Sequence, residues 1–133
     1  MDVPAITDSL ERVAALGDPA PEVYALLFRT CPDMEALFVR DTNGAVRANM
    51  LAEATMAILD YLEGNSYGAN LFRIEHVNHE NLGVPRDVFA LFFRSMRDAY
   101  AHILGPDWTP AHAGAWAMLL DRIDHELQAG VDG

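Results

Sequence analysis

The sequence is poor in basic residues. Nine Lys and Arg side chains stand against twenty Asp and Glu side chains, which gives a formal net charge of −11. Nucleic-acid binding depends on neutralising phosphates with Lys and Arg, and the basic residues here form no stripe. The same acidity disfavours an anionic membrane surface. We therefore expect neither nucleic acid nor a membrane as a partner, and we attribute the charge to solubility.

Cysteine and long apolar runs are also scarce. The single cysteine, Cys31, excludes an internal disulfide and a cysteine-based metal cage. No apolar stretch approaches the length of a membrane span. The first four residues, Met-Asp-Val-Pro, lack the basic region and the apolar run of a secretory signal. These absences predict a cytoplasmic protein.

Strand signals are missing, and helix signals recur along the chain. No run of alternating β-branched residues is convincing, whereas proline recurs at predicted helix starts and glycine at predicted helix ends. With 133 residues, half of them apolar, the chain is long enough for one core. We expect a single all-α domain over residues 1–133, with six or seven helices.

Apolar residues at helical spacing locate these helices. The first is expected from Ile6 to Leu16, with Asp8 or Ser9 near its start. The other expected segments are a helix opening at Pro21, a short turn from Pro32 to Phe38, a long helix from Gly44 to about Leu62, a helix over residues 69–80, a helix ending at Gly105 and a last helix that starts after Thr109.

The last two helices have the clearest patterns. The final helix has Thr109 as an N-cap with Pro110 behind it. Its apolar face comprises Trp116, Leu119, Leu120, Ile123 and Leu127. The helix before it carries Phe89, Phe92, Phe93, Met96, Tyr100 and Ile103 at helical spacing. The pattern leaves open whether Tyr100 and these helices face the core or form a homodimer surface.

Three motifs follow one another along the chain. Residues 32–38 read Pro-x-x-x-x-Leu-Phe, and residues 79–84 read His-x-x-x-Gly-Val. Residues 104–109 read Leu-Gly-x-x-Trp-Thr, and an Ala-Trp pair follows at 115 and 116. In this order and at these separations the motifs resemble the globins, particularly bacterial single-domain haemoglobins and the haem domains of flavohaemoglobins. The resemblance covers residues 9–127 and implies a globin fold around a pocket for haem b.

The resemblance implies that His79 ligates the haem iron. The second ring N–H of such a histidine is usually fixed by a carbonyl or carboxylate, and on a helix the carbonyl of Glu75 is within reach in principle. His76, one turn earlier, is the competing candidate, but the Gly-Val spacing favours His79. Val84 and Phe38 would clamp the porphyrin.

Tyr24 is the predicted polar residue on the gas-binding side. It lies eight residues before Pro32, where bacterial globins commonly carry a distal tyrosine. A phenol there can donate a hydrogen bond to bound O₂ and slow its release. The alternative is an ordinary core tyrosine. Phe28, one turn further on, is better interpreted as a core residue than as a contact to the cofactor.

The distal position on the long helix stays open between two residues. Counting back from the predicted iron ligand favours Arg47 with Leu51 as its apolar neighbour, whereas matching the Asn-Gly loop favours Val46 with Met50. An arginine could reach a haem propionate or enter the distal site. A valine would leave Tyr24 as the sole polar group there. A solvated surface side chain is the competing interpretation of Arg47.

Phe89 departs from the family pattern. Ten residues after the iron ligand, flavohaemoglobins carry a tyrosine that joins a proximal hydrogen-bond network. A phenylalanine cannot donate, which disfavours the electron-pushing pocket of a dioxygenase. We therefore expect reversible binding of O₂ or another diatomic gas such as NO or CO. The alternatives are an NO dioxygenase served by a separate reductase and a haem-free globin-fold module that senses or binds a partner.

The other histidines carry no recognisable metal motif. His102, His112 and His125 lie on two predicted helices without a ligand spacing such as His-Glu-x-x-His. We therefore predict no catalytic or metal-binding role for them.

Overall fold

The computed structural model describes residues 1–64, 68–70, 72 and 86–132, and the regular elements among them are all helical. The side chains of residues 86, 89 and 129–132 also lie outside the description. The elements are α1 (Val3–Leu16), α2 (Ala20–Thr30), the 3₁₀ helix η1 (Pro32–Phe38), α3 (Ala45–Leu62), α5 (Arg86–Leu104), the 3₁₀ turn η2 (Gly105–Asp107) and α6 (Pro110–Asp132). The predicted all-α class is confirmed.

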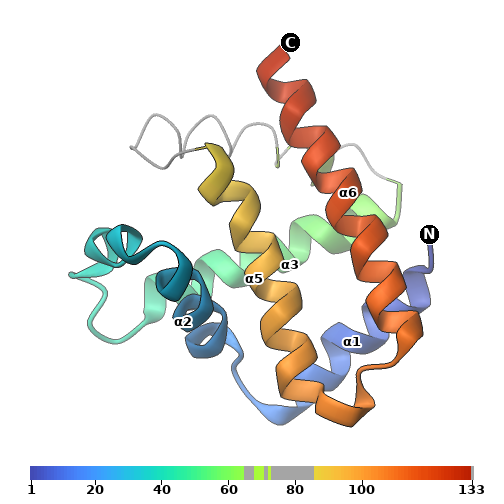
Figure 1. Ribbon diagram of the computed structural model, residues 1–133, viewed down its shortest axis with the longest axis horizontal. Helices are drawn as coiled ribbons and strands as arrows, with labels where there is room; N and C mark the ends of the chain where they lie inside the picture. Colours follow the sequence, from blue (N-terminus) through green and yellow to red (C-terminus); the bar gives the residue numbers. More distant parts are fainter. Residues whose placement is uncertain (65–67, 71, 73–85, 133) are drawn as a thin grey trace.

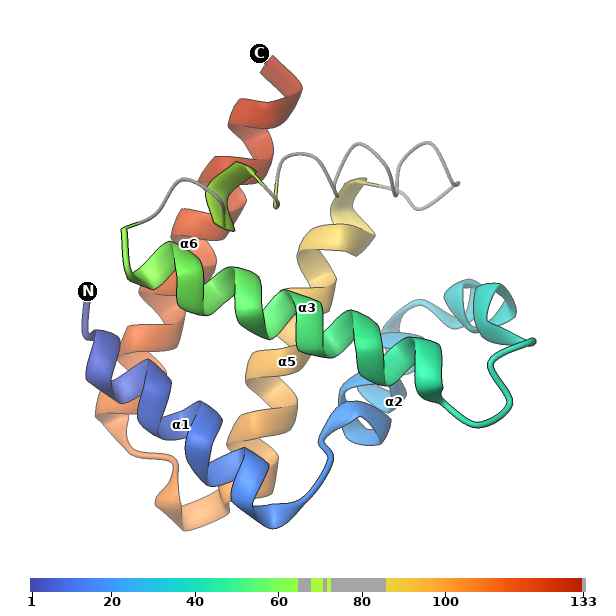
Figure 2. The same cartoon turned by 180° about the vertical axis from the view of Figure 1, so that it is seen from behind.

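The helices cross one another instead of forming a parallel bundle. α5 and α6 pack together as a pair, and α1 packs against both. In Figure 2, α3 crosses the view in front of this pair. α2 contacts α5, α3 and η1, so the short 3₁₀ helix is held at one end of the molecule (Figure 1). This arrangement places α2, η1 and the start of α3 close to one another.

The core is built from the predicted helix faces. The five apolar residues predicted for the face of α6 are all buried. On α5, Phe93, Met96 and Tyr100 are also buried. The rings of Tyr100 and Trp116 meet edge to face at 5.8 Å. Tyr100 is therefore a core residue and is not available to a homodimer partner.

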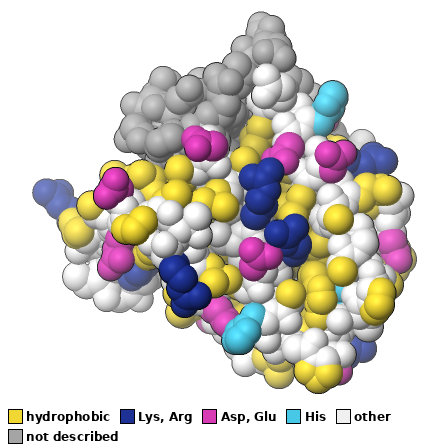
Figure 3. Space-filling model, viewed as in Figure 1, with side chains coloured by type: hydrophobic (Ala, Val, Ile, Leu, Met, Phe, Trp, Pro, Cys, Tyr) yellow, Lys and Arg dark blue, Asp and Glu magenta, His cyan; other side chains and the backbone are white. Residues whose placement is uncertain are grey.

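The surface is mixed in character. On the face shown in Figure 3, acidic, basic and apolar side chains are interspersed. Across the part of the chain that the structure describes, none of the helices is both long enough and apolar enough to cross a membrane.

α1 begins three residues earlier than predicted. Asp2 is its N-cap, and the Asp2 carboxylate accepts a hydrogen bond from the backbone N–H of Ala5 at 3.1 Å. Pro4 lies in the first turn, where a missing N–H costs little. The expectation that Asp8 or Ser9 lies near the helix start is therefore wrong, since both occupy the middle of α1.

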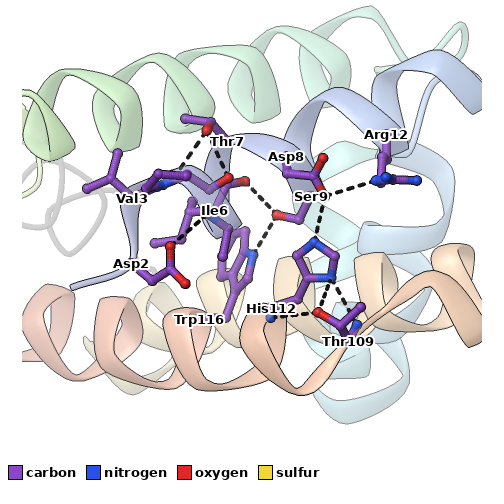
Figure 4. A network of polar contacts seen from close by, with 12 residues as sticks. Asp2, Val3, Ile6, Thr7, Asp8, Ser9, Arg12, Thr109, His112 and Trp116 are labelled. Atoms are coloured by element: carbon purple, nitrogen blue, oxygen red, sulfur yellow. Dashed lines mark hydrogen bonds and ion pairs between the residues drawn. The ribbon is translucent and has the colours of Figure 1, made fainter.

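Ser9 and Trp116 form a buried polar contact between α1 and α6 (Figure 4). Neither side chain is exposed to solvent. The indole Nε1–H of Trp116 donates to Ser9 Oγ at 2.9 Å, and the Ser9 hydroxyl donates to the carbonyl of Ile6 at 2.6 Å. Both polar groups are satisfied, so the contact costs little to bury and fixes how the two helices dock.

His112 forms a second polar contact between the same helices (Figure 4). His112 is 5% exposed, and its Nδ1 accepts a hydrogen bond from the backbone N–H of Thr109 at 2.9 Å. Because an N–H can only donate, Nδ1 is unprotonated and Nε2 donates to Asp8 Oδ2 at 2.7 Å. The Thr109 hydroxyl accepts in return from the backbone N–H of His112 at 3.3 Å. This reciprocal pairing is a capping box with histidine in the usual place of Glu or Gln.

Asp8 should make the stability of the fold depend on pH under acidic conditions. Its hydrogen bond to His112, together with Arg12, holds the pKa of this carboxyl below its usual value against the opposing effect of burial. Such a group stabilises the fold above its unfolded pKa of about 4, and this contribution is lost as pH falls through the lower folded pKa. We expect Asp8→Asn to lower Tm at pH 7 and the difference from wild type to be smaller at pH 3.

Circular dichroism melts at both pH values measure this difference. Asp98→Asn is the matched control, since Asp98 is an exposed aspartate whose carboxylate pairs with its neighbour Arg97. A Tm gap for Asp8→Asn that keeps its size at pH 3 would contradict the role of the charge.

Gly68 lies against α3 so closely that a side chain does not fit. Its N–H donates to Asp60 Oδ2 at 2.5 Å. A Cβ at this position would collide with the carbonyl oxygen of Ala57 and lie 2.7 Å from the backbone nitrogen of Tyr61. We expect Gly68→Ala to lower the free energy of unfolding by about 1–3 kcal/mol, because backbone atoms cannot move aside easily. At Gly114 on α6, a Cβ would meet nothing within 4 Å. We expect Gly114→Ala to raise the free energy of unfolding by about 0.4–1 kcal/mol. Urea unfolding measures both variants.

Candidate functional site

Four aromatic side chains from α2, η1 and α5 form a cluster. The ring of Tyr24 lies 5.4 Å from that of Phe38 and 5.7 Å from those of Phe28 and Phe92. Phe28 and Phe38 are themselves 5.6 Å apart and half-buried. The sequence assigned the first three to one site and missed Phe92, whose only signal was its place in the helical pattern of α5.

Tyr24 is the deepest member of this aromatic cluster, and its hydroxyl is unsatisfied. The side chain is 2% exposed, and within the described residues its hydroxyl finds no hydrogen-bond partner. An unpaired buried donor costs about 1–3 kcal/mol, so such groups in native proteins usually meet a ligand or a water. Burial raises the pKa of Tyr24 well above its usual value; Arg47 opposes this shift and Asp41 adds to it. The phenol therefore stays protonated at neutral pH and has a hydrogen to donate.

The buried Asp41 lies just before α3 and pairs with Arg47 in the first turn of that helix. The Asp41 carboxylate accepts from the backbone N–H of Val46 and of Arg47, each at 3.0 Å. Arg47 Nε donates to the same carboxylate at 3.0 Å, and Nη2 donates to the Asp41 carbonyl at 2.8 Å. Burial alone would raise the pKa of Asp41, but these hydrogen bonds and the guanidinium charge hold it below its usual value.

The two candidates for the distal position have different surroundings. Val46 is 54% exposed, whereas Arg47 is tied to Asp41 with a side chain 30% exposed. Of their predicted apolar neighbours, Leu51 is buried and Met50 is half-buried. The pairing of Arg47 with Asp41 was missed, although an aspartate shortly before a predicted helix start is a signal that its carboxylate accepts from the free N–H groups of the first turn.

The predicted iron ligand lies outside the described residues. This holds for His79, for its competitor His76 and for Val84. Phe89 belongs to α5, but its side chain is also outside the description. Among the described residues, no three or more His, Cys, Asp or Glu side chains gather as a metal site would require. A haem iron takes a single axial ligand from one face, so the His79 prediction does not depend on such a cluster.

The remaining histidines have ordinary surroundings. His102 is exposed, with Nε2 3.4 Å from a carboxylate oxygen of Glu22, and His125 is exposed on α6. His112 has the structural role described above, which sequence reasoning missed.

Comparison of the chain with family models, with curated proteins and with solved structures gives no match.

Proposed function

We propose that this chain is a globin that binds haem b and, through it, reversibly binds O₂ or another diatomic gas. The observation that carries the proposal is Tyr24, a buried phenol without a hydrogen-bond partner among the described residues, set in an aromatic cluster. The motif order of the sequence supports it independently, because that order selects Tyr24 and Phe38 before their contact is known.

The described residues fit a flat, apolar cofactor with a small hydrogen-bond acceptor beside it. Phe28 and Phe38 offer half-buried rings, which suit stacking on a macrocycle. Tyr24 offers a donor in a site that excludes water. The crossing helices, with a short 3₁₀ helix after the second, also agree with the proposed globin arrangement.

Each residue then has a distinct task. Haem supplies an iron centre at which one diatomic molecule binds and leaves without net reaction. His79 would hold the iron through an imidazole nitrogen, and Phe38 and Val84 would hold the ring. Tyr24 would donate its hydroxyl hydrogen to the gas and slow its departure. Arg47 stays with Asp41 unless that ion pair opens.

The direct test is haem uptake. Hemin titration into the purified protein should give a saturable Soret band at a ratio of about one haem per chain. A pyridine-haemochrome assay on the protein as purified should identify haem b. A chain that carries no haem and takes up none would overturn the proposal and favour the haem-free module.

Tyr24→Phe separates the role of the hydroxyl from that of the ring. With haem bound, we expect O₂ to dissociate about tenfold faster, which is the loss of one hydrogen bond in a dry pocket. In the haem-free protein the same substitution should raise the free energy of unfolding by about 1 kcal/mol, since it removes an unpaired buried hydroxyl. Stopped-flow oxygen release and urea unfolding measure the two effects.

Tyr61→Phe is the matched control, since Tyr61 is a half-buried tyrosine of α3 outside the aromatic cluster. It should leave oxygen release unchanged. If Tyr24→Phe instead destabilises the haem-free protein, the hydroxyl has a partner and its proposed role is wrong.

A further inference from the structure

The ion pair of Asp41 and Arg47 lies close enough to Tyr24 for both charges to act on its phenol. Arg47 opposes the rise in the pKa of Tyr24, and Asp41 adds to it. Tyr24 and Arg47 also line the same cavity of about 670 Å³, which α2, η1 and the start of α3 border. The pair therefore belongs to the surroundings of the hydroxyl that is proposed to meet the gas.

The two charges have opposite effects at Tyr24, and the structure fixes their positions relative to each other. A nearby cation favours negative charge at the phenol, whereas a nearby carboxylate disfavours it. The side chain of Asp41 is 4% exposed, so solvent screens its charge only weakly. Arg47 donates to Asp41 through both Nε and Nη2, which keeps the guanidinium beside the carboxylate. With the pair intact, the two fields oppose each other at Tyr24.

Asp41 does not depend on Arg47 to keep its place. Its carboxylate also accepts from the backbone N–H groups of Val46 and Arg47, each at 3.0 Å. These backbone donors remain when the guanidinium is removed by substitution. Each partner of the pair can therefore be left unpaired separately, so that one variant exposes the positive charge and the other exposes the negative charge.

We propose that Asp41 is a positioning residue of the gas site, which holds the Arg47 guanidinium and offsets its charge so that Tyr24 alone distinguishes O₂ from CO. This inference rests on the proposed gas-binding function and adds a determinant of gas preference to it. Polarity on the gas-binding side matters more for O₂, because O₂ takes up more negative charge than CO when it binds. An unpaired Arg47 would therefore hold O₂ more strongly, and an unpaired Asp41 would hold it more weakly.

Stopped-flow release of O₂ and of CO from haem-loaded variants tests these signs. Asp41→Asn leaves the guanidinium charge unpaired and should slow O₂ release about threefold, whereas Arg47→Met leaves the carboxylate charge unpaired and should speed it about threefold. CO release should change by less than about 1.5-fold in both variants. The double variant carries neither charge and should release O₂ within about 1.5-fold of wild type. Loosened packing would instead move both single variants, and both gases, in the same direction.

A second readout needs no haem. A fluorinated tyrosine at position 24 has a more acidic phenol than tyrosine, and fluorine NMR follows its titration in the folded haem-free chain. Asp41→Asn should lower the pKa of this phenol and Arg47→Met should raise it, each through a change of about threefold in the ionisation constant. Asp124→Asn is the matched control, since Asp124 pairs with Arg94 between α5 and α6. It should leave both this titration and O₂ release unchanged.

Arg47→Lys keeps the positive charge and carries the test if Asp41→Asn fails to fold, which circular dichroism would show. It should release O₂ within about 1.5-fold of wild type. An effect equal to that of Arg47→Met, shifts of one sign in Asp41→Asn and Arg47→Met, or an absent shift in either readout would overturn the role of Asp41. A chain that gives no Soret band with hemin overturns the gas-binding function and this inference together, whereas loaded variants with unchanged O₂ release overturn this inference alone.

Discussion

Replacing His79 with alanine is expected to abolish the Soret band that hemin gives with the wild-type chain. The iron would lose its only protein ligand, so haem would be held by apolar contacts alone. Even outer-shell changes weaken metal sites by 10- to 100-fold, so we expect haem retention to fall by at least about 100-fold. Hemin titration and the rate of haem transfer to an acceptor protein measure this loss. Added imidazole should restore the band in His79→Ala, because it replaces the missing side chain.

His76→Ala is the matched control, three residues earlier in the sequence. It should leave the band and the ligand-binding spectra unchanged. If the two variants exchange their behaviour, His76 is the iron ligand and the Gly-Val spacing misled the assignment. If both retain the wild-type spectrum, neither histidine ligates the iron, and the globin proposal is wrong.

Local signals in the sequence predicted the last helix well. Thr109 and Pro110 define its start through chemistry confined to one turn, and the structure confirms the cap. The burial of Trp116 and Ile123 follows from helical spacing, which is also local. The start of α1 was predicted too late because Asp2 gives the same cap signal as Asp8, and periodicity could not choose between them.

Contacts between distant residues had no such signal. His112 and Asp8 are 104 residues apart, and Ser9 and Trp116 are 107 apart. None of these four residues has a sequence signal that points to its partner, because a polar pair becomes recognisable only when the fold brings its members together. This is why His112 was given no role from the sequence.

The aromatic cluster was predicted only in part. The motif order predicted that Tyr24 and Phe38 share a site, and their rings are 5.4 Å apart. Phe92 was not predicted as part of the site because it is one of several aromatic residues at helical spacing on α5. The contact between Asp41 and Arg47 was not predicted because the two residues are six positions apart and meet only once the turn before α3 has formed. His79 and Val84, outside the described residues, stay predictions.

Trp116 should show the largest stability effect in the described part of the fold. It is fully buried, packs edge to face on Tyr100 and donates to Ser9. We expect Trp116→Ala to lower the free energy of unfolding by about 3–5 kcal/mol, because it opens a cavity and removes a hydrogen bond. Urea unfolding followed by circular dichroism measures the loss. Trp108→Phe is the matched control at the other tryptophan, which is half-buried, and it should cost less than about 1.5 kcal/mol.

A double-mutant cycle isolates the hydrogen bond from the packing. Ser9→Ala leaves the buried Nε1–H of Trp116 unpaired and should cost about 1–3 kcal/mol, whereas Trp116→Phe removes the donor and keeps an aromatic ring. The double variant should therefore be more stable than the sum of the two single losses implies, by about 0.5–2 kcal/mol. Strictly additive losses would show that the bond adds nothing to stability. The docking of α1 on α6 would then depend on apolar packing and on the Asp8–His112 contact alone.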